Sequence, residues 1–148
     1  MTDARFAGKT IKVKKVDDKA IVPTRANNND AGWDLYSITT RNIAPSQRVT
    51  IRTGISLEIP EEYVGLIWPR SGMSVKNGID VLAGVVDSGY RGEIKVCLLN
   101  TSREWMDIKE GDRIAQILFQ EVPHFQLQEV DILQNSDRGE GGFGSSGK

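Results

Sequence analysis

The chain has 148 residues, enough for one domain with a single buried core but too few for two such domains. Hydrophobic residues make up 39% of it and charged residues 26%, as in an ordinary globular domain. Nineteen basic residues against twenty acidic ones give a net charge of −1, so we do not expect a general binder of nucleic acids or membrane surfaces. A small anionic ligand suits this balance, because a few arginines and backbone amides suffice to bind a phosphate.

The cysteine content indicates the kind of cellular compartment in which the protein is expected. Cys97 is the one cysteine, so it cannot form an internal disulfide, and it lies in an apolar, strand-like run. We expect a buried, unreactive thiol rather than a reactive one, in a reducing, cytoplasmic setting. The chain does not open on a signal-peptide pattern, and no stretch approaches the roughly 18 apolar residues of a membrane span. The sequence therefore predicts a soluble protein.

Alternation of apolar and polar residues dominates the chain, which is typical of half-buried strands. In chain order the alternating runs cover residues 11–13, 49–59, 64–68 and 94–98, and the third run presents Val64, Leu66 and Trp68 on one face. Turn-forming residues separate the runs, as at 27–30, 60–62 and 87–89. The pattern predicts an all-β antiparallel barrel or jelly roll.

Two further elements are expected. Residues 71–77 are compatible with one short helix, and Gly78 is placed to end it. The composition changes near Gln134, where a glycine-rich tail begins. We therefore divide the chain into a folded domain over residues 1–133 and a flexible tail over residues 134–148.

The tail imitates two nucleotide-binding motifs. Residues 139–144 match the G-x-G-x-x-G pattern and residues 142–148 match the start of a P-loop. Neither match has the strand before it and the helix after it that phosphate binding by these motifs requires. The glycine amides, the Arg138 guanidinium and two serine hydroxyls nevertheless suit a phosphate, and Phe143 could stack on a flat ring. The alternative is a solvated tail with an incidental arginine.

Five segments in order carry a family resemblance: residues 31–37, 69–74, 83–92, 111–117 and 138–147. Together they resemble the five motifs of the trimeric dUTPase family. The resemblance implies a distorted jelly-roll β-barrel with one short helix, assembled as a homotrimer in which each active site is built from all three subunits. It implies hydrolysis of dUTP to dUMP and pyrophosphate by attack of water on the α-phosphorus. This reaction would limit uracil in DNA and supply dUMP for thymidylate synthesis.

The resemblance also implies a cofactor. Mg²⁺ is expected, held through the substrate phosphates and ordered waters rather than by protein ligands, and the sequence offers no obvious cluster of metal-binding side chains. The expected partners are dUTP and two further copies of the chain, with no nucleic acid or membrane.

The third motif is expected to hold the nucleoside. By resemblance, Asp87 is the catalytic carboxylate, which contacts the sugar 3′-hydroxyl and orients the attacking water, since a carboxylate can accept its proton. The alternative is an aspartate that caps a turn. Tyr90 is expected to pack on the sugar and exclude ribose, or else to be a core tyrosine. The main chain of residues 84–86, which are Gly84, Val85 and Val86, with Lys95 nearby, is expected to read uracil.

The other motifs are expected to hold the triphosphate. Arg70, Ser71 and Gly72 resemble the phosphate-binding segment and would stabilise negative charge in the transition state. Gln116 resembles the residue that points to the α-phosphate or to a metal-bound water. Asp34 is expected to support Arg70 or the metal's water shell, so the catalytic set is Asp87, Gln116, Arg70 and Asp34. We expect Arg113 to make a structural contact at a turn or between subunits.

The tail is expected to close over the substrate as a lid. By resemblance Arg138 reaches the phosphates, Phe143 covers uracil, and the segment Gly144, Ser145 and Ser146 wraps the γ-phosphate. Trp33 stands where the family more often has a smaller residue or a tyrosine. His124 lies outside every motif, and we interpret it as structural or exposed.

Two rival functions deserve a test. A dCTP deaminase shares the barrel and the trimer but needs an acid–base glutamate near the pyrimidine, and Glu93 is the acid just beyond the third motif. A barrel that binds a nucleotide or a protein partner and regulates without turnover is the second rival. Ammonia release from dCTP would support the first, and absence of pyrophosphate release from dUTP the second.

Overall fold

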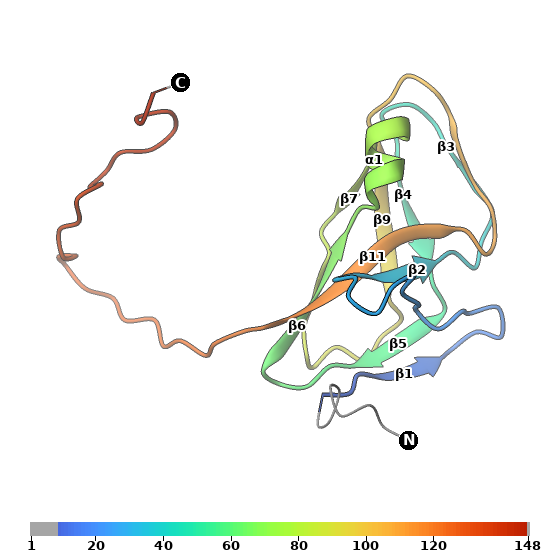
Figure 1. Ribbon diagram of the computed structural model, residues 1–148, viewed down its shortest axis with the longest axis horizontal. Coiled ribbons are helices and arrows are strands. Elements are labelled where there is room, and N and C mark those ends of the chain that lie inside the picture. Colours follow the sequence, from blue (N-terminus) through green and yellow to red (C-terminus); the bar gives the residue numbers. More distant parts are fainter. Residues whose placement is uncertain (1–8, 148) are drawn as a thin grey trace.

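The structure is a computed structural model that describes residues 9–147 (Figure 1), so the first eight residues of the predicted domain and Lys148 of the predicted tail lie outside it. Within this range the chain forms short strands and one helix. The elements are β1 (Lys12–Lys15), β2 (Trp33–Tyr36), β3 (Arg41–Ile43), β4 (Arg48–Arg52), β5 (Ile55–Glu58), β6 (Tyr63–Trp68), α1 (Ser71–Asn77), β7 (Ile79–Leu82), β8 (Val85–Val86), β9 (Lys95–Asn100), β10 (Met106–Ile108) and β11 (Arg113–Glu121).

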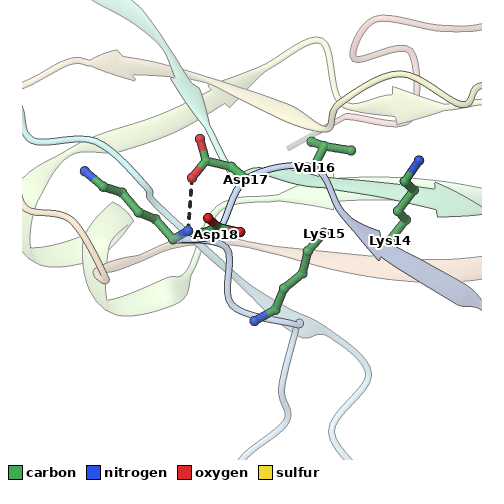
Figure 2. A pocket seen from close by; sticks show the side chains of 6 residues that line it. Lys14, Lys15, Val16, Asp17 and Asp18 are labelled. Atoms are coloured by element: carbon green, nitrogen blue, oxygen red, sulfur yellow. Dashed lines mark hydrogen bonds between the residues drawn. The ribbon is translucent and has the colours of Figure 1, made fainter.

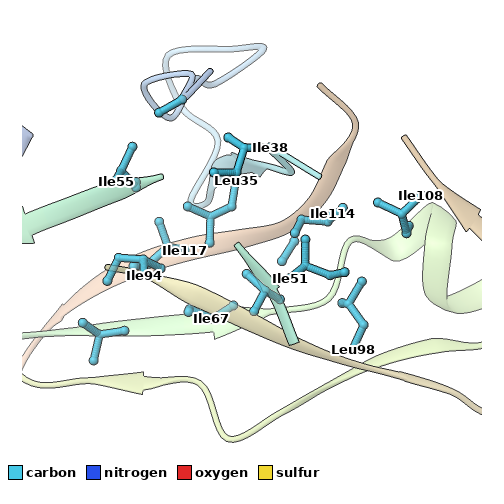
Figure 3. Packing of buried hydrophobic residues seen from close by; sticks show 14 of the residues in the cluster. Leu35, Ile38, Ile51, Ile55, Ile67, Ile94, Leu98, Ile108, Ile114 and Ile117 are labelled. Carbon is cyan, nitrogen blue, oxygen red and sulfur yellow. The ribbon is translucent and has the colours of Figure 1, made fainter. Parts of the chain in front are cut away.

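The strands pair into four antiparallel sheets, in the orders β1-β5, β10-β3, β2-β11-β6-β8 and β4-β9-β7. Neighbours in a sheet are mostly far apart in the sequence, as expected of jelly-roll connections rather than simple hairpins. The sheets surround one apolar core (Figure 3), rich in isoleucine from strands of every sheet. The prediction of an all-β fold with a distorted barrel architecture is confirmed.

The alternating run over residues 49–59 makes two strands instead of one. It breaks at Gly54, whose φ is +69° and where a Cβ would lie 2.9 Å from the Cβ of Ala20. Glycine is therefore required at this corner by conformation and by space. The break sends β4 to pair with β9 and β5 to pair with β1, while Ile51 and Ile55 both stay buried.

The strand β6 buries the face opposite to the one its alternation favours. Gly65 and Ile67 point into the core, whereas Val64 and Leu66 are half-buried and Trp68 is 56% exposed. The face on which Val64, Leu66 and Trp68 alternate is therefore the outer face of the strand. The strand is apolar on both faces, so the period-two pattern does not show which face meets the core.

Cys97 is half-buried, not buried as predicted. Along β9 the side chains of Val96 and Leu98 face the core, and Cys97 lies between them in sequence, so its thiol points to the other face of the sheet. As in β6, the apolar run around Cys97 does not show which face of the strand meets the core.

The predicted helix is confirmed with its bounds, as α1 ends at Gly78 in the left-handed conformation with φ of 65°. The Gly78 amide donates to Ser74 O at 3.0 Å, which closes the last turn. In the part of the chain that the structure describes, no helix is long and apolar enough to cross a membrane.

The packed body ends at β11. Val122 N donates to Glu62 O at 2.8 Å, and from Pro123 onward the chain is exposed and runs away from the body (Figure 1). The extended part thus begins before the boundary at 134 that the composition suggested. We call residues 123–133 the arm and residues 134–147 the tail.

Candidate active site

A pocket of about 230 Å³ lies where the β7–β8 turn meets the start of β9. Its lining includes every residue of the third motif that was predicted to recognise the nucleoside, together with Lys95, but not Phe143 of the tail. These lining residues are Gly84, Val85, Val86, Asp87, Tyr90 and Lys95, joined by Ile67, Ala83, Glu93 and Ile94. The structure therefore brings the third motif together around one hollow.

The β7–β8 turn has a backbone shape that depends on glycine. Ala83 and Gly84 have φ of 60° and 103°, and Ile67 N donates to Gly84 O at 2.8 Å. A Cβ at Gly84 would lie 2.7 Å from Ile67 O, closer than real contacts allow. The turn therefore lies directly on β6, and Gly84 adds no side chain to the pocket that it lines.

Asp87 follows β8 on the pocket rim with an exposed side chain. The Tyr90 amide donates to Asp87 O at 3.1 Å and closes a turn, but the Asp87 carboxylate has no hydrogen-bond or ion-pair partner among the described residues. The alternative that Asp87 serves as a turn cap is therefore not supported, because a cap would accept from nearby amides. Its oxygens are available to a ligand.

Tyr90 stands beside Asp87 and is 47% exposed, so it is not a core tyrosine. Its hydroxyl donates to Glu93 O at 3.0 Å. Glu93 in turn has its carboxylate held by Arg52, with Nη2–Oε1 at 2.9 Å.

A second group of polar side chains gathers around Asp34 on β2. Arg70 Nε donates to Asp34 Oδ1 at 3.1 Å, and Arg113 Nη1 lies 3.6 Å from Asp34 Oδ2. The predicted support of Arg70 by Asp34 is formed, and Arg113 shares the same carboxylate. Ser71 and Gly72 follow Arg70 as the exposed first residues of α1, where helix amides have no intrahelical acceptor.

Gln116 completes this second group. It pairs with Asp34 on one side and Trp68 on the other, and its Nε2 donates to Pro69 O at 3.0 Å. Its Oε1 lies against Gly32, where any Cβ would overlap it. Gly32 thus leaves room for the Gln116 amide, a role that was not predicted, although its place beside Asp34 in the first motif was a signal.

The two groups lie toward opposite ends of β6. Val86 pairs with Gly65 and Gln116 pairs with Trp68, three residues apart or about 10 Å along the strand. Asp87 follows Val86 toward the start of β6, while Arg70 lies beyond its end. One chain therefore does not bring its nucleoside pocket and its arginine–carboxylate group into one compact site.

The tail is not brought to either group. Its hydrogen bonds among the described residues are local, such as Arg138 Nε to Gly141 O at 2.6 Å and Ser145 N to Gly142 O at 3.1 Å. Phe143 is fully exposed with φ of 49°. The tail runs away from the packed body (Figure 1), and the pocket lining includes none of the predicted lid residues Arg138, Phe143, Gly144, Ser145 and Ser146.

A separate hollow covers the turn after β1 (Figure 2) and is lined by residues 14–19. Local hydrogen bonds account for its shape, since Lys19 N donates to Asp17 Oδ1 and Ala20 N to Asp17 O, both at 3.0 Å. All of its lining comes from one consecutive stretch, so it is a surface turn rather than a convergent site.

The donor groups near Asp34 and Gln116 determine how a metal ion could be held. Among residues 9–147 no three His, Cys, Asp or Glu side chains gather as a metal site. The Asp34 carboxylate is occupied by two arginines, whereas Gln116 Oε1 has no donor among the described residues and can accept from a water. This donor set fits Mg²⁺ held by phosphates and water, with protein contact through that water.

The described residues thus offer a pocket with a free carboxylate and a separate arginine–carboxylate group, which suit the nucleoside and the phosphates of a nucleotide. The family model described as dUTPase matches residues 18–147, and the chain therefore belongs to the dUTPase family.

Similar proteins from distantly related organisms support this family assignment. The chain is 44% identical over 137 residues to the deoxyuridine 5′-triphosphate nucleotidohydrolase of Swinepox virus, covering 93% of this chain and 96% of the relative. It is 47% identical over 140 residues to the protein of that name from Nocardia farcinica, and the match covers 93% of this chain and 85% of the relative. It is 40% identical over 141 residues to that of Mus musculus, covering 95% and 87%.

Solved structures show the same fold. The Staphylococcus bacteriophage 80alpha dUTPase with dUPNHPP superposes with a TM-score of 0.88 at 31% identity, covering 95% of this chain and 99% of that one. A mutant dUTPase from phage phi11 of S. aureus, described as coordinating a structural Mg(II) ion, has a TM-score of 0.80 at 26% identity, covering 85% and 99%.

Proposed function

We propose that this protein hydrolyses dUTP to dUMP and pyrophosphate. The observation that carries the proposal is the Asp87 carboxylate, which has no partner among residues 9–147 and lies at a pocket that the β7–β8 turn helps to line. The names of its relatives support the substrate. The reaction would remove a precursor of uracil in DNA and yield dUMP for thymidylate synthesis.

The nucleoside end of the substrate is assigned to the third motif. Main-chain groups of Gly84, Val85 and Val86 would pair with the uracil edge, and cytosine would leave them unpaired because its donors and acceptors are reversed. Lys95 lines the same pocket. Tyr90 would lie against the deoxyribose, where a ribose 2′-hydroxyl would meet its ring.

The reaction itself is assigned to Asp87. Its carboxylate would accept a hydrogen bond from the attacking water and orient the oxygen toward the α-phosphorus. The new P–O bond forms as the bond from the α-phosphorus to the bridging oxygen of the β-phosphate breaks, and pyrophosphate leaves with that oxygen. The proton of the water passes toward Asp87 and on to solvent.

The triphosphate is assigned to the group around Asp34. Arg70, aligned by Asp34, would bring positive charge to the phosphates, with Ser71 and Gly72 offering donors at the start of α1. Gln116 Oε1 would accept from a water in the metal's shell. Mg²⁺, when bound with the substrate, would neutralise phosphate charge and polarise the phosphoryl oxygens.

A homotrimer with shared sites is part of the proposal. The separation of Asp87 from Arg70 along β6 supports a site that takes these two groups from different copies. The outer face of the β2-β11-β6-β8 sheet also carries apolar side chains, among them Leu66, Trp68, Val85 and Leu118, with Val85 67% exposed. An antiparallel sheet that is apolar on both faces is expected to be covered on both.

The arm and tail complete the proposed assembly. Phe125, Leu127, Ile132 and Leu133 of the arm are each more than 80% exposed in one copy, and their burial on another copy would favour assembly. The tail would then reach a neighbour's pocket, with Arg138 at the phosphates, Phe143 over uracil and residues 144–146 (Gly144, Ser145 and Ser146) around the γ-phosphate. We therefore propose residues 134–148 as a lid and the preceding chain as the assembled domain.

The surroundings of Glu93 disfavour deamination. Arg52 donates to both carboxylate oxygens of Glu93, so the Glu93 carboxylate is engaged in an ion pair and is not free to transfer protons at a pyrimidine. A regulatory role without turnover is disfavoured by the free carboxylate of Asp87. We further propose a cytoplasmic setting, which rests on the single half-buried cysteine.

The deciding experiment measures pyrophosphate release with Mg²⁺ from dUTP, dCTP, dTTP and UTP, together with ammonia release from dCTP. We expect rapid release from dUTP alone. Ammonia from dCTP would instead assign a deaminase. A folded protein that releases no pyrophosphate from dUTP would refute the proposed hydrolase.

A further inference from the structure

The Glu93 carboxylate is held by an arginine that belongs to none of the five motifs. Arg52 on β4 places its Nε 3.1 Å from both Oε1 and Oε2, and its Nη2 2.9 Å from Oε1. The Glu93 side chain is only 13% exposed, and Arg52 Nη2 also reaches Asp17 Oδ2 at 3.4 Å. This two-pronged contact fixes the direction of the Glu93 side chain and, with it, residue 93 of the chain.

Tyr90 depends on the same residue through the main chain. Its hydroxyl donates to Glu93 O at 3.0 Å, and its ring folds back over Gly92. A Cβ at Gly92 would lie 2.5 Å from the hydroxyl oxygen and 2.6 Å from Cζ, so the ring can take this place only because residue 92 has no side chain. Among the described residues, the hydroxyl has no other hydrogen-bond partner.

We propose that the Arg52–Glu93 ion pair is a positioning device for Tyr90, which makes Arg52 a determinant of the discrimination between deoxyribose and ribose. Arg52 does not touch the substrate. It holds Glu93, the Glu93 carbonyl holds the Tyr90 hydroxyl, and Gly92 provides the surface on which the ring lies. This inference rests on the proposed function, because it concerns how that function selects its sugar.

Tyr90 needs a positioning contact because its ring is exposed. A ring that is 47% exposed is not fixed by packing on all sides, so its orientation depends on its hydroxyl contact and on Gly92. A sugar hydroxyl is excluded sterically only if the ring stays in place, and small displacements of a positioning group have large effects on rates. Arg52 and Glu93 are 41 residues apart, and the β4–β9 pairing brings them together.

The test is a cycle of variants in the full-length protein. The measured quantity is the ratio of kcat/KM for dUTP to kcat/KM for UTP, in the wild type, Arg52→Gln, Tyr90→Phe and the double variant. We expect Arg52→Gln and Tyr90→Phe each to lower this ratio about ten-fold, and the double variant to lose less than about two-fold more, because both break one chain of contacts. Arg52→Lys should recover part of the ratio, since it keeps the charge but not the two-pronged contact.

Lys19→Ala is the matched control. It breaks a more exposed ion pair, Lys19 Nζ–Glu110 Oε2 at 3.1 Å, and it keeps the backbone amide that donates to Asp17 Oδ1. The side chains of this pair contact neither Arg52 nor Glu93 nor Tyr90 among the described residues, so the ratio should stay unchanged. Gly92→Ala provides a second route, because its methyl group would displace the Tyr90 ring while leaving Arg52 in place. It should lower the ratio even if Arg52→Gln fails to fold.

The outcomes separate this inference from the proposed function. Absence of dUTP turnover in the wild type would refute the function itself. Normal wild-type turnover with an unchanged dUTP-to-UTP ratio in folded Arg52→Gln, or in Gly92→Ala should Arg52→Gln not fold, would overturn the positioning role. So would an Arg52→Gln effect of equal size in the Tyr90→Phe background, because independent effects multiply.

Discussion

Asp34 accepts a hydrogen bond from Arg70, with Oδ1 3.1 Å from Nε, and Asp34 and Arg70 come from segments 36 residues apart. The same carboxylate lies 3.6 Å from Arg113 Nη1, so one acid balances two arginines. Asp34 has a side-chain exposure of 17%, and this shielding makes its charge more effective than that of an open surface acid. Arg70 is therefore held in one orientation before any phosphate arrives.

Replacing Asp34 with asparagine should lower kcat/KM for dUTP by about ten- to a hundred-fold, because Arg70 loses both its counter-charge and its alignment. The measurement is pyrophosphate release over a range of dUTP concentrations. Arg113→Gln should cost less, since Arg113 makes the longer contact and is not assigned to the phosphates. Equal losses in the two variants would contradict a role of Asp34 through Arg70.

Replacing Asp87 with asparagine should reduce kcat by about a hundred-fold or more while a non-hydrolysable dUTP analogue still binds, because the amide keeps the shape but cannot accept the proton. Steady-state kinetics and calorimetric titration of the analogue check the two parts. Asp80→Asn is the control, an exposed aspartate on β7 whose carboxylate, within the described range, accepts a hydrogen bond only from the neighbouring amide of Val81. A near-normal rate in Asp87→Asn would mean that another group orients the water.

Replacing Gly84 with alanine should raise KM for dUTP and destabilise the fold by about 1–3 kcal/mol, because φ of 103° is unfavourable for alanine and the new Cβ would press on Ile67 O. Kinetics and thermal unfolding measure the two effects. Gly72→Ala is a fair comparison for stability, since a Cβ there meets nothing within 4 Å. If Gly84→Ala unfolds like the wild type, the turn does not require glycine.

Two truncations should separate the arm from the tail. Deletion of residues 138–148 should leave the molar mass of the assembly unchanged and reduce dUTP turnover strongly, because the lid no longer excludes water from the site. Deletion of residues 123–148 should also weaken the assembly, because it removes the exposed apolar side chains of the arm. Light scattering and pyrophosphate release give both readouts. Full activity after the shorter deletion would refute the lid.

The stability of the fold should depend on pH in part through Glu58, which lies on β5 and pairs with Lys12 on β1. The pKa of Glu58 is lowered from its ordinary value of 4.5, chiefly by a hydrogen bond from Lys12 and by the charge of Lys12, with a smaller effect of Arg91. A lowered pKa in the folded state stabilises the fold above about pH 4.5, and this stabilisation is lost as the pH falls through the lower folded-state value.

Glu58→Gln should therefore unfold at a slightly lower temperature than the wild type at neutral pH, and the difference should disappear as the pH falls below 4.5 and through the lower folded-state pKa of Glu58. Thermal unfolding across this range is the measurement. The difference is expected to be small because the pair is exposed. A difference that persists unchanged at the acid end would assign the effect of Glu58 to packing instead of charge.

The fold was predictable where one local signal acted alone. The helix over residues 71–77 and its end at Gly78 were predicted because a left-handed glycine after a helix is a local feature. The face of β6 was not, because Val64, Leu66 and Trp68 alternate as regularly as a core face does. The structure buries Gly65 and Ile67 and leaves the larger side chains for the outer face.

In the candidate site, too, features that are local in sequence were predictable and contacts made by strand pairing were not. The motifs alone were enough to nominate Asp87, Tyr90 and the turn at Gly84, since these residues are close in sequence and line one pocket. They could not show that Arg70 lies toward the other end of β6 from Asp87, because that separation depends on the pairing of β8 and β11 with β6. Nor did any motif contain Arg52, which reaches Glu93 only because β4 pairs with β9.

The sequence by itself therefore determined which chemical groups the protein carries and the family to which it belongs, because short motifs at fixed spacing are enough to identify both. Only the tertiary structure decided which of those groups meet within one copy, which apolar face stays uncovered, and what holds Tyr90 in place. The physical reason is that strand pairing joins residues far apart in the chain, and an alternating pattern is the same whichever face the core selects.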